Sequence, residues 1–180
     1  PYRVGPVAFE ERAVNQAIDD QLIRADLLVV VGEISQPGGI IRSQISRLGE
    51  VSFDEGSTSL GVFGHGSVGE DHVPLLALPG DPAIAALLFG VLAVPMIHAM
   101  RGVRAPAPVQ VRLAADVARL PVTRLVPARL SGDEAMPVGN GRLTLLDLNR
   151  ADVVLRILPG SGHQDRGAGV LALPLRTGPT

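Results

Sequence analysis

The chain contains no cysteine and no lysine. The absence of cysteine excludes disulfides, thiolate nucleophiles and zinc–thiolate sites, and it is typical of a reducing compartment, so we expect a cytoplasmic protein. All 16 basic residues are arginine, so no mechanism can use a lysine amine or a Schiff base. Covalent catalysis by a thiol or an amine is therefore excluded.

Aromatic residues are also scarce, and neither sign of charge is in large excess. There is no tryptophan and aromatic residues make up 3% of the 180 residues, so burial must rest on aliphatic side chains. The net charge of -2, with both signs scattered, gives no basic stripe and argues against a nucleic-acid partner. No uninterrupted apolar run approaches the ~20 residues of a membrane span, and nothing resembles a signal peptide, so we expect no span.

No residue cluster has the spacing of metal ligands, and we expect no resident metal site. The four histidines lie far apart in the sequence and are expected to be surface or packing residues: His65, His72, His98 and His163. Three acidic residues have two open interpretations, as substitute metal ligands or as a solvated loop face: Asp54, Glu55 and Asp71.

Residues 1–102 alternate between helix and strand signals. Apolar residues three and four apart predict helices over 9–25, around 41–48 and from Pro82 to about Met100, with a kink at Pro95. Short apolar runs predict strands at 27–31, 50–53 and 73–78, separated in part by a glycine-rich stretch at 56–69. The run at 27–31 is fully apolar, which is typical of a strand buried on both faces of a parallel sheet. These patterns predict an α/β layer.

The pattern changes after residue 102. Residues 103–108 read as a linker, and residues 109–180 contain short strand-like runs punctuated by glycine and proline. The predicted strands are 110–116, 123–130, 134–138, 142–146, 153–158 and 170–175. This spacing predicts a small β-barrel or sandwich. The fold class is therefore α/β followed by all-β, with domains at 1–102 and 109–180.

One junction in the α/β part has the form of an anion site. The strand at 73–78 runs into Pro79-Gly80, which is turn chemistry, and then into Asp81 and Pro82, which suit a helix cap and the first helical position. The first N–H groups of such a helix point at whatever binds beyond the strand. A well-capped connection with no ligand explains the same residues, and both interpretations stay open.

The order of these pieces resembles the carboxyl-terminal half of the molybdopterin molybdenumtransferase family, the bacterial MoeA proteins and the gephyrin E domain. In the α/β part the resemblance rests on residues 25–35, 68–71 and 78–82, and on the proline late in the following helix. In the β part it rests on residues 113–117, 124–130 and 150–154.

The resemblance implies a three-layer α/β molybdopterin-binding domain that here lacks its first strand and helix, followed by a small β-barrel. It implies the insertion of molybdate into adenylylated molybdopterin with the help of Mg²⁺, within a homodimer. Because a sheet that lacks a strand has an exposed edge, we expect the chain to rely on a partner chain there.

The resemblance also implies which residues contact molybdopterin. Gly32 and Ser35 correspond to a Gly-Gly-Val-Ser loop, and Gly80, Asp81 and Pro82 to a Pro-Gly-Asn-Pro turn. The chemistry agrees, because small residues let the backbone approach a phosphate and a hydroxyl can donate to it.

The chain departs from the family pattern in ways that weaken oxyanion binding. Glu33 replaces a glycine and Asp81 replaces an asparagine, and each adds negative charge. The catalytic acid of the family is matched only by Gln36-Pro37-Gly38-Gly39-Ile40, and its lysine loop only by Leu60-Gly61-Val62-Phe63. No catalytic residue is identified, and we expect catalysis to be weakened or lost.

Three hypotheses follow. In the first, the chain is of the molybdopterin molybdenumtransferase type and retains some affinity for molybdopterin. In the second, it is a gephyrin-like scaffold that binds a protein partner, which the loss of charge at Gly38, Gly39 and Leu60 and an apolar groove between the α/β layer and the β module would favour. In the third, it is a truncated product without a function of its own.

Overall fold

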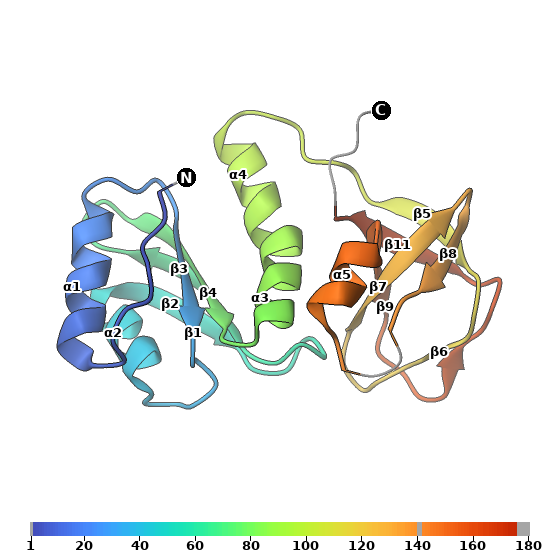
Figure 1. Cartoon of the computed structure of the whole chain (residues 1–180), viewed down its shortest axis with the longest axis horizontal. Coiled ribbons are helices and arrows are strands. Elements are labelled where there is room, and N and C mark those ends of the chain that lie inside the picture. The colour runs from blue at the N-terminus through green and yellow to red at the C-terminus, as the bar shows by residue number, and fades with distance from the viewer. Residues whose placement is uncertain (1, 140–141, 176–180) are drawn as a thin grey trace. The chain divides into compact units, whose positions relative to one another are not determined.

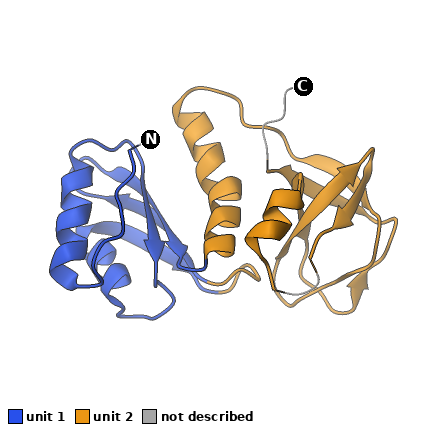
Figure 2. Cartoon of the chain, in the orientation of Figure 1, with its two compact units in different colours: residues 1–55, 62–81 blue, residues 56–61, 82–180 orange. Residues whose placement is uncertain are grey.

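The computed structural model describes residues 2–139 and 142–175. The chain forms two compact units (Figure 2): Pro1–Glu55 with Val62–Asp81, and Gly56–Gly61 with Pro82–Thr180. Residues 103–108 carry neither helix nor strand. The expected domain boundaries at residues 102 and 109 remain a prediction, and each unit is described here by itself.

The first unit is a four-stranded sheet with the strand order β1-β4-β3-β2. The strands are β1 (Leu28–Gly32), β2 (Gly49–Asp54), β3 (Phe63–Val68) and β4 (Val73–Pro79). β1 and β4 are parallel, with Leu28 opposite Leu75 and Gly32 opposite Pro79. β3 runs antiparallel to both of its neighbours. The carboxyl ends of β1 and β4 therefore lie at the same end of the sheet, which we call the β1–β4 edge.

Two helices cover one face of this sheet (Figure 1). They are α1 (Glu11–Leu22) and α2 (Ile40–Leu48), and their apolar sides form one core with the sheet. The buried residues of this core are Val14, Ile18, Ile34, Ile41, Ile45, Val68, Leu75 and Ala77. Glu11 joins the two helices, because its carboxylate accepts hydrogen bonds from Gln44 at 2.6 Å and Arg47 at 2.8 Å.

The expectation that the strand at 27–31 is buried on both faces is wrong. β1 pairs only with β4 among the described strands, so it is an edge strand, and Val31 is 54% exposed. The apolar composition of β1 is that of an interior parallel strand. β4, which pairs on both sides, is the strand buried in the middle of the sheet, and its residues Leu75 to Leu78 are all buried.

β3 was not expected, because its glycines hide the strand pattern. Gly64 and Gly66 have low β-propensity but are required by packing. A Cβ atom at Gly64 would lie 2.8 Å from the Phe53 ring, and one at Gly66 would overlap the Glu50 carbonyl oxygen of β2. The glycine-rich stretch at 56–69 thus contains a strand, β3, and the absence of side chains at its glycines lets it pair closely with β2.

In the second unit, the helix expected from Pro82 to Met100 is present but interrupted. It consists of α3 (Pro82–Leu88), the π-helical turn η1 (Phe89–Ala93) and α4 (Val94–Met100). The Val94 N–H donates to the Phe89 carbonyl, five residues back. Because Pro95 has no N–H for the carbonyl four residues before it, the interruption expected at this proline takes the form of a wider turn just ahead of it.

The sequence-based statement that no apolar run approaches the length of a membrane span needs correction. Pro82–Met100 is 19 residues long with a mean hydropathy of 2.2, and 28% of this stretch is buried. By length and composition alone, it is long and apolar enough to cross a membrane. A single such helix does not establish a span, because core helices of water-soluble proteins pass the same test.

The rest of the second unit is a closed barrel with the strand order β11-β5-β8-β7-β9 (Figure 1). Its strands are β5 (Val109–Leu113), β7 (Arg124–Ser131), β8 (Glu134–Pro137), β9 (Val153–Ile157) and β11 (Gly169–Pro174). The short strands β6 (Val117–Ala118) and β10 (His163–Gln164) pair separately. The interior is aliphatic and includes Leu113, Leu155 and Ile157. The predicted β-barrel is confirmed.

The strand expected at 142–146 is wrong. That segment leads into a helix, α5 (Leu145–Arg150), which begins with a capping box: the Thr144 side chain accepts from the Asp147 N–H, and the Asp147 carboxylate accepts from the Thr144 N–H. The Thr-x-x-Asp spacing is a helix-start signal that the short apolar run obscured.

Replacing Gly66 with Ala should destabilise the first unit. Its Cβ would overlap the Glu50 carbonyl oxygen and lie 2.8 Å from Val51 Cα, and backbone atoms cannot yield as a side chain can. We expect the free energy of unfolding, measured by urea denaturation, to fall by about 1–3 kcal/mol. Gly56→Ala is the matched control, because a Cβ there meets nothing within 4 Å. Equal stability of the two variants would contradict the β2–β3 packing.

Candidate functional site

The parallel pairing of β1 with β4 brings two loops together. Gly32 ends β1 opposite Pro79 of β4, and a Cβ atom on Gly80 would lie 3.4 Å from the Gly32 carbonyl carbon. The carboxyl ends of β1 and β4 and the loops after them thus contain four of the five predicted site residues in the first unit: Gly32, Ser35, Gly80 and Asp81. Pro82, the fifth, opens α3 in the second unit.

The role expected for Gly32, close backbone approach to a phosphate, stays a prediction. The structure adds a packing role. A Cβ at this position would overlap Cδ1 of Ile41, a buried residue of α2. The missing side chain at Gly32 therefore makes room for core packing under the loop. Gly80 is exposed, and its Cβ would make only ordinary contacts with Gly32.

Ser35 is held in place by its neighbours in the β1–α2 loop. Ile34 is fully buried and anchors the loop in the core, while Glu33 and Ser35 are exposed on either side of it. The Ser35 N–H donates to Glu33 Oε1 at 2.8 Å, and the Ser35 hydroxyl donates to the same oxygen. The predicted phosphate donor thus already has an acceptor, which is the carboxylate that replaces a family glycine.

The Glu33 carboxylate is stabilised in its charged form. Hydrogen bonds from the Ser35 hydroxyl, the Ser35 N–H and the Gln36 N–H lower the pKa of Glu33 below its usual value. The group is exposed and stays negative at neutral pH. Asp81, half-buried in the second loop of the same edge, adds another carboxylate. The edge therefore carries negative charge and offers little attraction to an oxyanion.

The two segments that the resemblance matches to the family's acid and lysine loops have structural roles. In 36–39, the Gly39 N–H donates to the Gln36 carbonyl at 2.9 Å, and Gly38 has a φ of 85°. Proline followed by a glycine of positive φ is typical of a type II turn. Leu60, where the lysine loop was expected, is buried in the second unit. Neither segment presents a charged side chain.

No metal site is present among residues 2–139 and 142–175, where no three His, Asp or Glu residues lie close enough to hold an ion. The acids considered as substitute ligands are not brought together. Asp54 pairs with Phe63 at one end of β3, whereas Asp71 follows the other end, and Glu55 forms an ion pair with Arg42. Glu55 and Asp71 are exposed outside the strands, as the solvated-loop interpretation expects, whereas Asp54 is a half-buried residue of β2.

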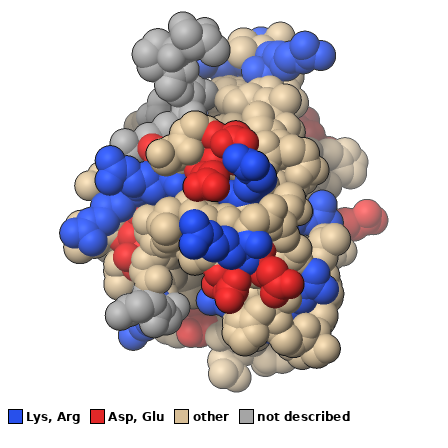
Figure 3. Space-filling model, turned by 90° about the vertical axis from the view of Figure 1, so that its right-hand side faces the viewer, with Lys and Arg blue, Asp and Glu red and all other residues tan. Residues whose placement is uncertain are grey.

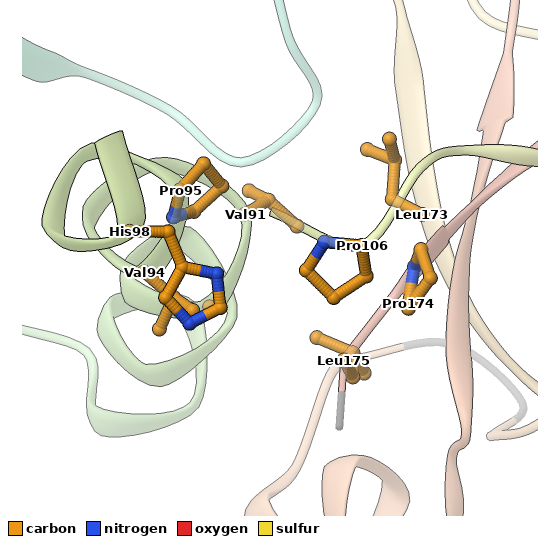
Figure 4. A pocket seen from close by; sticks show the side chains of 9 residues that line it. Val91, Val94, Pro95, His98, Pro106, Leu173, Pro174 and Leu175 are labelled. Atoms are coloured by element: carbon orange, nitrogen blue, oxygen red, sulfur yellow. The ribbon is translucent and has the colours of Figure 1, made fainter. Parts of the chain in front are cut away.

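The second unit has an apolar hollow of about 390 Å³ that contains none of the predicted site residues (Figure 4). Helix residues, including Val91, Val94 and Pro95, line one side, and Pro106 and residues 173–175 line the other. His98 also lines it, and its Nδ1 is buried without a hydrogen-bond partner among the described residues. The sequence predicts an apolar groove between residues 1–102 and the β module, which is where this hollow lies, but it identifies none of the lining residues.

A second hollow of about 490 Å³ lies on the barrel and is lined by Arg119 and Arg156, together with amide and aliphatic side chains. Arg119 is engaged with the Gln164 side chain. On the face drawn in Figure 3, arginine and acidic side chains alternate and form no continuous patch of one sign. That face has no basic stripe of the kind that binds nucleic acid.

Comparison of the sequence identifies two curated relatives. They are the proteins named molybdopterin molybdenumtransferase 1 of Mycobacterium tuberculosis strains CDC 1551 / Oshkosh and H37Rv. Each is 33% identical to this chain over 106 residues, which make up 58% of this chain and 25% of the relative. The chain thus matches about a quarter of the relatives' length. No protein-family model matches the chain.

Comparison of the structure identifies two similar solved structures. A molybdopterin biosynthesis MoeA protein from Pyrococcus horikosii superposes with a TM-score of 0.76 at 22% identity, over 93% of this chain and 41% of that protein. A molybdenum cofactor biosynthesis protein from Pyrococcus furiosus superposes with a TM-score of 0.72 at 16% identity, over 96% of this chain and 57% of that protein. At these low identities, the superpositions establish a shared fold. Together with the sequence match, they confirm the resemblance to the MoeA carboxyl-terminal region.

The packing role of Gly32 can be tested by a double-mutant cycle with Ile41. Gly32→Ala should lower the free energy of unfolding by about 1 kcal/mol, because its Cβ overlaps Ile41 Cδ1 and the end of that buried side chain must shift. Ile41→Val removes that methyl group and should cost about 0.5–1.5 kcal/mol alone. The double variant should lose less than the sum by at least about 0.5 kcal/mol. Strict additivity in urea denaturation would refute the contact.

The pH response of the β1–α2 loop should report Glu33. Because the folded pKa is depressed, the contribution of these hydrogen bonds is present above the ordinary value of 4.5 and is lost as pH falls through the lower folded pKa. The ¹⁵N–¹H signal of Ser35, followed by NMR, should therefore titrate with a midpoint below 4.5. Glu33→Gln should abolish this transition. A midpoint at or above 4.5 would contradict the hydrogen bonds.

Proposed function

We propose, from the similarity of this chain to the carboxyl-terminal region of the molybdopterin molybdenumtransferases, that it belongs to a molybdenum cofactor biosynthesis protein and contributes part of a molybdopterin site. The ligand contacts would come from Gly32, Ser35, Gly80, Asp81 and Pro82. The substrate of the whole protein would be adenylylated molybdopterin, into which molybdate is inserted.

The observation that carries the proposal is the edge formed by β1 and β4. Their parallel register places the loops that follow Gly32 and Pro79 beside each other, although more than forty residues separate them in the sequence. Ligands of open α/β sheets bind beyond the carboxyl ends of such strands. Ser35 and Gly80 are exposed there and can be reached from solvent.

The same edge supports weakened catalysis. Glu33 and Asp81 place two carboxylates where the ligand brings a phosphate and molybdate, and the segments at 36–39 and 60–63 supply neither an acid nor a cation. Removing one electrostatic donor typically costs about 2.7–4 kcal/mol of transition-state stabilisation. The described residues contain no cluster of three His, Asp or Glu side chains that could hold Mg²⁺, so we derive no step through a divalent cation.

The edge also bears on assembly. β1 has one hydrogen-bonded neighbour among the described strands, and Val31 in it is exposed. An open apolar strand edge is a template for pairing with another strand. We include a homodimer, or an upstream segment that covers this edge, in the proposal.

A second candidate function, a gephyrin-like scaffold for a protein partner, is favoured by the apolar hollow of the second unit. Its lining is mainly aliphatic and proline side chains, and it opens between α4 and the end of β11. Peptides with apolar anchors bind in grooves of this kind. In this function the β1–β4 edge would bind no pterin.

A titration of the purified chain with molybdopterin, under exclusion of oxygen, separates the two functions. The first predicts saturable binding, followed by pterin fluorescence or heat, that strengthens when molybdate is added. The scaffold function predicts none. Absence of binding to a chain shown by circular dichroism to be folded would overturn the molybdopterin proposal for this chain.

Asp81→Asn should tighten molybdopterin binding. The change removes a like charge from the ligand edge, and such a repulsion is worth about 1 kcal/mol at short range in water, or roughly fivefold in Kd. Asp71→Asn is the matched control, because Asp71 is an exposed acid in the β3–β4 turn at the opposite edge of the sheet. If the Asp81 variant binds no more tightly than the control, Asp81 does not face the ligand.

A further inference from the structure

The β1–α2 loop binds a carboxylate of its own chain. Glu33 Oε1 accepts the Ser35 N–H at 2.8 Å and the Ser35 hydroxyl. Two donors of one residue thus converge on one carboxylate oxygen.

A backbone N–H and a hydroxyl that point at one charged oxygen can bind phosphate, sulfate and carboxylate alike, because each presents the same kind of acceptor. The two donors of Ser35 are therefore suited to an oxyanion, and the anion that they bind is the side chain of Glu33.

Buried and exposed residues explain why Glu33 occupies this position. Ile34 is fully buried and fixes the backbone between the two partners. Residues on either side of a buried residue in extended chain project away from the core, and both Glu33 and Ser35 are exposed. The carboxylate needs only to fold back over the loop to reach the donors.

We propose that Glu33 is an internal ligand that occupies the oxyanion donors of the β1–α2 loop and decides whether this loop accepts an external oxyanion. An external phosphate or molybdate must displace the carboxylate before it can reach the two donors of Ser35. The inference deepens the proposed function, since Ser35 is one of its expected ligand contacts, but it concerns the chain's own contacts and can be tested with inorganic phosphate.

Occupancy of the loop donors by Glu33 and simple repulsion by its charge predict different effects of substitution. Repulsion depends only on the charge of Glu33, so a neutral residue of any shape would relieve it equally. Occupancy depends also on the acceptor oxygen, which glutamine retains and alanine lacks. The two variants therefore separate the two effects.

The test is a titration of the chain and of the variants Glu33→Ala and Glu33→Gln with inorganic phosphate, following the ¹⁵N–¹H signals of Ser35 and Gln36. We expect Glu33→Ala to bind phosphate at least tenfold more tightly than the unaltered chain, and Glu33→Gln to fall between them. Glu50→Ala is the control, because Glu50 is an exposed acid at the start of β2, at the other edge of the sheet. It should bind like the unaltered chain.

Two results would overturn the inference: equal gains in both Glu33 variants, which mean charge alone, or no gain in Glu33→Ala. Because Glu33 is exposed, the variants are expected to fold, and their spectra show this directly. The same proteins titrated with molybdopterin distinguish the two proposals. Molybdopterin binding without a phosphate gain in Glu33→Ala refutes only the internal ligand, and a phosphate gain without molybdopterin binding refutes only the proposed function.

Discussion

The parallel pairing of β1 with β4 is the constraint on which the candidate site depends. It sets Gly32 opposite Pro79, so that the loop before α2 and the turn before α3 begin at the same edge. β4 can hold this position because both of its faces are buried and β3 pairs along its other side. Without this register, Ser35 and Asp81 would be unrelated surface residues.

Charge then decides what this edge can bind. The backbone geometry offers donors in the loop after β1, which suits an oxyanion, whereas Glu33 and Asp81 bring negative side chains to the same place. A fold shared with MoeA proteins thus carries a site with altered electrostatics. Fold similarity establishes the fold alone, so the proposed role rests on the sequence match and the proposed loss of catalysis rests on the side chains at this edge.

Where the sequence predicted the structure correctly, the signal was local and strong. The helix from Pro82 and strand β4 have long apolar patterns and clear turn chemistry, and the barrel strands are spaced by glycine and proline. Errors arose where local signals conflicted with packing. β3 was hidden by Gly64 and Gly66, which β2 requires, and the start of α5 at Thr144 was taken for a strand because its capping box lies next to a short apolar run.

The sequence by itself determined the fold class, the residues that follow strands β1 and β4 and the family resemblance, because each depends on neighbours in the chain. Tertiary structure decided the contacts between side chains, which the local pattern does not specify. It made β1 an edge strand, gave Gly32 a packing role against Ile41, and turned Glu33 back onto Ser35. These outcomes depend on which distant segments meet, and one-dimensional periodicity does not encode the position of a contacting side chain.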